Sequence, residues 1–194
     1  MEAFDRDRLA HSLAPLPPWK KLAFMALTCE RMLPNFGRFA SETKFGEVSI
    51  LRHALDSAWI YIQSGKLEGD PDKLKRACED QAPDTELFRS IYTSAALDAA
   101  NAVAAIFDAI KNPSVEHVLE TAALARDTVD LFVQQTNNLD DPCDPSFEQS
   151  ILTNSLMQRE LCRQREDLAM VAGWIDRAGI ALGSINRQGS LQQG

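Results

Sequence analysis

The chain has 194 residues, of which 45% are hydrophobic and 25% are charged, and its formal net charge is -8. These values predict one soluble globular domain with a sizeable core. The acidic balance and the lack of a Lys/Arg cluster disfavour nucleic acid and an anionic membrane surface as partners, because both attract basic patches. Four separated cysteines and a charged N-terminus without an apolar run predict a reduced, cytoplasmic protein.

Proline, glycine and Asx–Pro pairs mark the boundaries of the predicted helices. An Asp or Asn followed by proline is typical of a helix start, and such pairs begin at residues 70, 112 and 144. Pro34 is expected to stop the first long helix, and a short amphipathic piece follows it. Apolar residues recur three and four positions apart, and no alternating run indicates a strand. The predicted helices span about 18–33, 47–63, 71–80, 85–111, 114–137 and 146–177.

These elements predict an all-α fold, a single-domain bundle of about six or seven mostly antiparallel helices. The domain is expected to comprise residues 1–182, with a polar, mobile tail over 183–194. Segment 91–107 has one charge, Asp98, and is barely long enough to cross a membrane. Its many alanines and its polar residues favour the central helix of a bundle, where small side chains allow close helix packing.

Glu30 and Arg31 stand side by side in a stretch, 23–35, that is apolar nearly all the way round a helix. Neither residue has a polar face to itself. A charge removed from water must be paired, because losing one partner of a buried pair costs roughly 3–5 kcal/mol. We therefore expect both side chains to have partners on other helices.

The candidate partners are few. Arg31 is expected to meet Asp98 or Asp56, and Glu30 is expected to meet Arg52 or a backbone donor. Such a network has two interpretations: it fixes the packing of the helices, or it lines a pocket and binds a small molecule. The candidate ligand-binding residues are Glu30, Arg31, Asn35, Arg52, His53, Asp56 and Asp98.

The same region carries a resemblance to a known family. A dense match is formed by "FMALTCERMLPN" (24–35), "FG" (45 and 46), Arg52, "LD" (55 and 56) and Trp59, and "YTSAALDAANAV" (92–103) extends it more loosely. On these residues the chain resembles the YjaG-like family of bacterial domains of unknown function over most of its length, apart from the C-terminal tail. The resemblance implies an all-helical bacterial protein and no particular reaction.

Templates for catalysis and metal binding do not match. No glutamate stands three residues before a histidine, as a di-iron bundle requires, and HExxH, GxSxG and GxxxxGK are absent. Cys29 with His53 is conceivable as a nucleophile pair, although a buried cysteine is usually inert. The acidic loop 139–148 lacks EF-hand spacing and is expected to be solvated. We therefore predict no metal and no cofactor.

Two functional hypotheses remain. The first is a non-enzymatic interaction or regulatory module, which binds an unknown protein partner or forms a homodimer through an exposed apolar helical patch. We prefer it because the catalytic templates fail. The alternative is a small-molecule-binding protein or enzyme that uses a polar cluster, which requires the cluster to face a cavity open to solvent. That cluster would comprise Glu30, Arg31, Arg52, Asp56 and Asp98.

Overall fold

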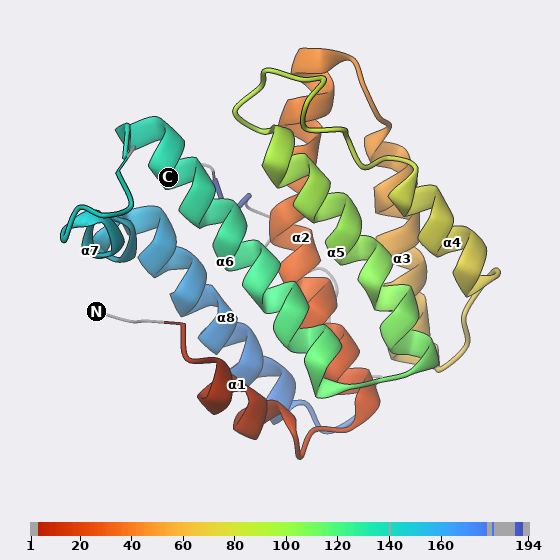
Figure 1. The fold of residues 1–194 in the computed structure, drawn as a ribbon. Coiled ribbons are helices and arrows are strands. Elements are labelled where there is room, and N and C mark those ends of the chain that lie inside the picture. Colours follow the sequence, from red (N-terminus) through yellow and green to blue (C-terminus); the bar gives the residue numbers. More distant parts are fainter. Residues whose placement is uncertain (1–3, 140, 178–179, 181–188, 192–194) are drawn as a thin grey trace.

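The computed structural model describes residues 4–139, 141–177, 180 and 189–191. Within this part of the chain it contains eight helices and no strand (Figure 1). The all-α prediction is confirmed, and the number of helices is slightly larger than expected. The helices are α1 (Arg6–Leu13), α2 (Pro18–Thr43), α3 (Val48–Ser64), α4 (Pro71–Glu79), α5 (Thr93–Lys111), α6 (Val115–Asn137), α7 (Phe147–Thr153) and α8 (Ser155–Gly173).

Helices α2 and α5 form the centre of the bundle and pack more extensively on each other than any other pair. Helices α3 and α4 lie on one side of this pair, and α6 and α8 lie on the other (Figure 1). Alanines fill most buried positions of α5, so the neighbouring helices can approach it closely. Among the described helices, α5 alone is long and apolar enough to span a membrane, and most of that stretch is buried inside the bundle.

Helix α2 continues through Pro34, and the prediction that this proline ends the helix is wrong. A proline inside a helix costs about 3 kcal/mol, because it cannot donate a hydrogen bond and its ring crowds the preceding turn. The burial of two aromatic side chains beyond the proline offsets this cost. Phe36 and Phe39 are fully buried beyond the proline, and each contributes about 1.5–3 kcal/mol. In the turn before the proline, the Arg31 carbonyl accepts a hydrogen bond from the backbone N–H of Ser190 at 3.0 Å.

The predicted helix 85–111 begins only at Thr93, because side chains in the preceding segment bond to the backbone. The Ser90 hydroxyl accepts a hydrogen bond from the N–H of Tyr92 at 3.1 Å, and the Thr93 hydroxyl donates to the Ser90 carbonyl at 2.7 Å. Such local bonds compete with helix formation. The same segment places Phe88 against Phe39, with the ring centroids 5.1 Å apart.

Two further boundaries also differ from the prediction. The expected last helix, 146–177, is divided into α7 and α8 at Asn154, which has an extended backbone (ψ 138°). Its side chain accepts from the N–H of Leu156 at 2.9 Å and so caps α8. The short helix α1 was not predicted, and the Asp5 carboxylate caps it by accepting from the N–H of Arg8 at 2.9 Å.

Three residues of the tail that was expected to be mobile, 189–191, pack against the bundle. Ser190 and Leu191 are each 4% exposed. Leu191 joins a second, smaller core between α6, α7 and α8. The structure differs from the expectation here because Leu191, a large aliphatic residue in this otherwise polar stretch, packs in an apolar site. The rest of the tail, 183–188 and 192–194, lies outside the described residues.

Replacing Gly46 by alanine is expected to lower the free energy of unfolding by about 2–4 kcal/mol. Gly46 has φ +77°, and a Cβ at this position would lie 2.7 Å from Cζ of the buried Phe36. Urea denaturation measures the change. Gly173→Ala is the matched control, since a Cβ there meets no atom within 4 Å. Equal effects of the two substitutions would contradict this account.

Candidate functional site

Glu30 is buried on α2 and accepts three hydrogen bonds from α3. The Arg52 guanidinium donates from Nη1 to Oε2 at 2.8 Å and from Nη2 to Oε1 at 2.9 Å. The Trp59 indole donates from Nε1 to Oε1 at 2.9 Å. Arg52 also pairs with the exposed Asp56 at 2.6 Å. The expected pairing of Glu30 with Arg52 is therefore confirmed, and it joins α2 to α3.

Arg31 points to the other side of α2 and meets two carboxylates of α8. Its Nε and Nη2 donate to Glu160 at 3.2 and 3.1 Å. Its Nη1 donates to the Asp167 carboxylate and to the Leu27 carbonyl. All donor nitrogens of this buried guanidinium therefore have acceptors, as a buried charge requires.

The charges in this second cluster are unequal, because one guanidinium faces two carboxylates. Burial lowers the pKa of Arg31, but the attraction of Glu160 and Asp167 outweighs this effect, so its pKa lies above the ordinary value and it stays charged. Burial raises the pKa of Asp167, with Arg31 opposing the shift. The Gln164 amide donates to Glu160 at 3.1 Å and to the Ala122 carbonyl at 3.0 Å, which extends the network to α6.

The other predicted site residues are dispersed. Asp98 faces α6, where it accepts from the Thr128 hydroxyl at 2.7 Å. The Asn35 amide donates to the Ser190 hydroxyl at 2.8 Å. His53 is exposed on α3, and its ring forms no hydrogen bond with the described residues. The predicted cluster is therefore divided: Glu30, Arg52 and Asp56 lie together, whereas Arg31 and Asp98 face other helices.

The prediction that Arg31 meets Asp98 or Asp56 is wrong, and the residues that sequence reasoning missed lie on α8. Glu160, Gln164 and Asp167 are four and three residues apart, so they share one face of the helix. Apolar positions 161, 168 and 171 occupy the same face. Polar residues within an apolar stripe were the available signal of a buried polar network.

The buried charges are too inaccessible to bind or react with a molecule from solution. The side chains of Glu30 and Glu160 are each 1% exposed, and that of Arg31 is 5% exposed. Cys29 is also fully buried, and burial raises the pKa of its thiol, which therefore stays protonated. Within the part of the chain that the structure describes, no three His, Cys, Asp or Glu residues are placed to hold a metal.

A cavity of about 720 Å³ lies elsewhere, between α1 and α8, and we call it the α1–α8 groove. Its walls include Phe4 and Leu9 on the α1 side and Leu161 and Leu168 on the α8 side. This volume falls in the range of ligand pockets. The groove could not be predicted from the sequence, because α1 itself was not predicted.

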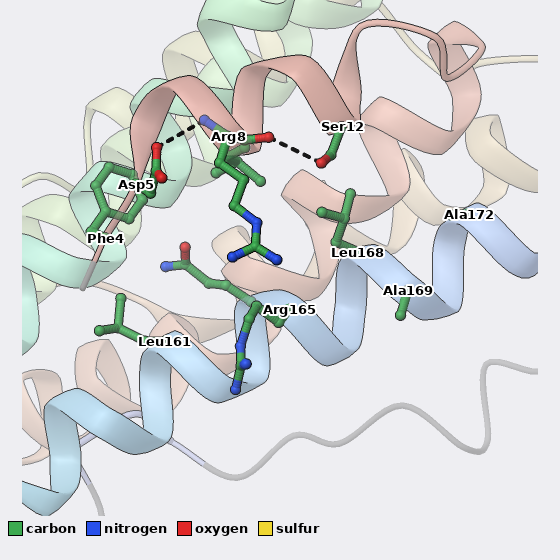
Figure 2. A pocket seen from close by; sticks show the side chains of 11 residues that line it. Phe4, Asp5, Arg8, Ser12, Leu161, Arg165, Leu168, Ala169 and Ala172 are labelled. Carbon is green, nitrogen blue, oxygen red and sulfur yellow. Dashed lines mark hydrogen bonds between the residues drawn. The ribbon is translucent and has the colours of Figure 1, made fainter. Parts of the chain in front are cut away.

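Two arginines, Arg8 and Arg165, line this groove. Figure 2 shows Arg8 reaching from α1 toward α8, whereas Arg165 turns away from α1. No described residue hydrogen-bonds or pairs with the Arg8 guanidinium. Gln164 also lines the groove, and its bond to Glu160 connects the groove to the buried network.

Replacing Arg31 by methionine is expected to lower the free energy of unfolding by about 3–5 kcal/mol, because Glu160 and Asp167 would stay buried without their cation. Chemical denaturation of the variant measures this loss. Arg38→Met, an exposed position on the same helix, should change stability by less than about 1 kcal/mol. Similar losses in both variants would contradict a role for the buried pair.

Replacing Asp98 by asparagine is expected to stabilise the protein more at high pH than at low pH. Burial raises the pKa of Asp98 to about 6 from an ordinary 3.8, against the Thr128 hydrogen bond and with a smaller contribution from Asp127. The folded chain therefore holds this proton more tightly, and stability falls as pH rises from about 4 through 6. The gain from Asp98→Asn should grow by about 2 kcal/mol between about pH 4.5 and 7.5. A gain independent of pH in urea titrations would contradict the shift.

Known proteins resemble this chain in both sequence and fold. Residues 8–190 match the family described as "Protein of unknown function (DUF416)". The uncharacterized protein YjaG of Escherichia coli K12 is 30% identical over 120 residues, and that of Salmonella typhimurium LT2 is 31% identical over 122 residues. In each case the match covers 60% of both chains, so this chain spans about 60% of the length of these relatives. An uncharacterized protein of Haemophilus influenzae is 27% identical over 137 residues, or 70% of both chains.

A crystal structure supports the fold. A DUF416 family protein from Shewanella baltica OS155 superposes with a TM-score of 0.77 at 22% identity, over 95% of this chain and 90% of that one. An identity this low supports the fold alone. The family match covers nearly the whole chain, and the YjaG resemblance read from residues 24–59 is confirmed. The chain belongs to the DUF416 family.

Proposed function

We propose that this protein is a non-enzymatic interaction module that docks an acidic, amphipathic helical segment of a partner protein in the α1–α8 groove. One observation carries the proposal: the Arg8 guanidinium has no partner among the described residues and lies over an apolar groove of about 720 Å³. A cation beside apolar walls favours a ligand with an apolar face and a carboxylate.

Small apolar side chains continue the groove toward the end of α8. Ala169 and Ala172 are exposed there and line the groove. Ile175, just after the helix, is 97% exposed. An amphipathic helix presents apolar side chains at intervals of three and four residues, which suits an extended apolar strip better than a compact solute does.

Charge favours an acidic partner over a basic one. The chain carries a net charge of -8, yet the groove presents Arg8. The Asp5 carboxylate also lines the groove, but it accepts the backbone N–H of Arg8 and caps α1. A carboxylate on the partner could accept hydrogen bonds from the Arg8 guanidinium, whereas an ammonium group would be repelled by its positive charge.

The buried network has a supporting role in this proposal. Arg31 binds α8 through Glu160 and Asp167, and Gln164 from the same network lines the groove. A wall held in this way is organised before the partner arrives, which reduces the entropy lost on binding. A ligand or catalytic site at Glu30 and Arg31 has less support, because both side chains are paired and almost inaccessible.

The test uses two labelled amphipathic peptides of roughly 18 residues, about five helical turns, with leucines on one face and either glutamates or lysines on the other. The wild-type protein is expected to bind the glutamate peptide at least about tenfold more tightly in fluorescence anisotropy titrations. Arg8→Gln should abolish this preference. Arg6→Gln is the matched control, since Arg6 lies on the same helix and pairs with Glu116 outside the groove.

Three outcomes would overturn the proposal. Equal affinity for the glutamate and lysine peptides would show that the charge of Arg8 does not select the partner. Binding of dodecanoate without binding of either peptide would indicate a small amphipathic anion as the ligand. A homodimer in sedimentation experiments that Ala169→Asp or Ala172→Asp dissociates would assign this surface to a second copy of the chain.

A further inference from the structure

We propose that the surface beside Pro34, where α2 faces α8, is a peptide-binding site that the chain fills with its own residues 189–191. We call it the Pro34 notch and define it by the Arg31 carbonyl, the Asn35 amide and the Arg159 guanidinium. It recognises a small hydroxyl residue followed by a large aliphatic one. This inference goes beyond the proposed function, because the notch lies between α2 and α8 and its ligand is not the acidic helix.

Every polar group of Ser190 is bound in the notch. Its N–H donates to the Arg31 carbonyl at 3.0 Å. Its hydroxyl accepts from the Asn35 amide at 2.8 Å. Its carbonyl accepts from the Arg159 guanidinium at 2.7 Å. Ser190 is 4% exposed, so these bonds satisfy groups that would otherwise be buried without partners.

The backbone acceptor of the notch is a helix carbonyl in the turn before Pro34. Pro34 lacks the N–H that would bond to the Glu30 carbonyl, and its ring crowds this turn. The Arg31 carbonyl lies in the same turn, and because a carbonyl oxygen has two lone pairs it can accept the Ser190 N–H in addition to a helical donor. The Arg31 carbonyl and the Asn35 side chain thus supply an acceptor and a donor side by side.

The residue after the serine supplies the apolar part of the recognition. Leu191 is 4% exposed and packs in the second core cluster, which α6, α7 and α8 build together with Ala95 of α5. A charged side chain at this position would be buried without a partner. The notch therefore selects a leucine-sized aliphatic residue here.

The notch is organised without the segment that fills it. The pairs of Arg31 with Glu160 and with Asp167 join α2 to α8, and neither involves residues 189–191. A preformed site loses little when its ligand leaves and can accept the same ligand again from solution. The segment can therefore be replaced by a separate peptide of the same sequence.

The experiment uses the full-length Leu191→Asp variant and a labelled peptide with the sequence of residues 187–194, RQGSLQQG. The variant should release its own segment and bind the peptide saturably in fluorescence anisotropy titrations. Wild type should bind at least about tenfold more weakly, because its notch is filled. A control peptide with aspartate in place of leucine should not bind. Adding Asn35→Ala to the variant should weaken binding about 2–10-fold, as expected for one hydrogen bond.

Absence of saturable binding to a variant that circular dichroism shows to be folded would overturn the proposal, as would equal binding to wild type. If Leu191→Asp does not fold, Leu191→Ala takes its place. Hydrogen exchange on wild type provides a second readout. The Ser190 amide should exchange at least about tenfold more slowly than in the free peptide, and an equal rate would also overturn the proposal. The acidic-peptide titration is independent of these results, so the two proposals fail separately.

Discussion

A guanidinium ion in the middle of a helical bundle must keep its partners, because an uncompensated buried charge costs about 3–5 kcal/mol. In this protein the constraint falls on Arg31 and determines where α8 packs. Glu160 and Asp167 bring α8 to α2, and Gln164 links the same network to α6. The outer surface of α8 forms a wall of the α1–α8 groove, and its junction with α2 forms the Pro34 notch. Both candidate binding surfaces therefore depend on this ion pair.

Two adjacent charges on one buried helix are explained by helical geometry. Successive side chains diverge by about 100°, so Glu30 and Arg31 point to different neighbours. Glu30 meets Arg52 and the Trp59 indole on α3, whereas Arg31 meets α8. Opposite charges at neighbouring positions thus fix α2 against both sides of the bundle. Exchanging the two residues would place like charges together at both contacts.

Local signals predicted the helices better than they predicted the contacts between helices. Asp70 and Pro71 marked the start of α4 because capping is a local interaction. Helix α1 was not predicted because it is short and mostly polar, and its stability depends on tertiary packing rather than on local sequence. The partner of Arg31 could not be chosen from the sequence, since Asp56, Asp98 and Glu160 all offer a carboxylate and only the packing of the helices selects one. Because α1 forms one wall of the α1–α8 groove, the groove could not be predicted either.

Solvent access separates the structural charges from those available for binding. A buried, paired charge can be exchanged for another partner only by opening the bundle, so the interaction of Arg31 with α8 is a poor site for reversible binding. Arg8 is exposed and has no described partner, so a ligand carboxylate displaces only water from it. The candidate binding residue is therefore not one of the buried charges singled out in the sequence but Arg8, a surface cation in a segment for which no helix was predicted. The buried charges contribute by holding α8, and thus the apolar side chains that face Arg8, in place.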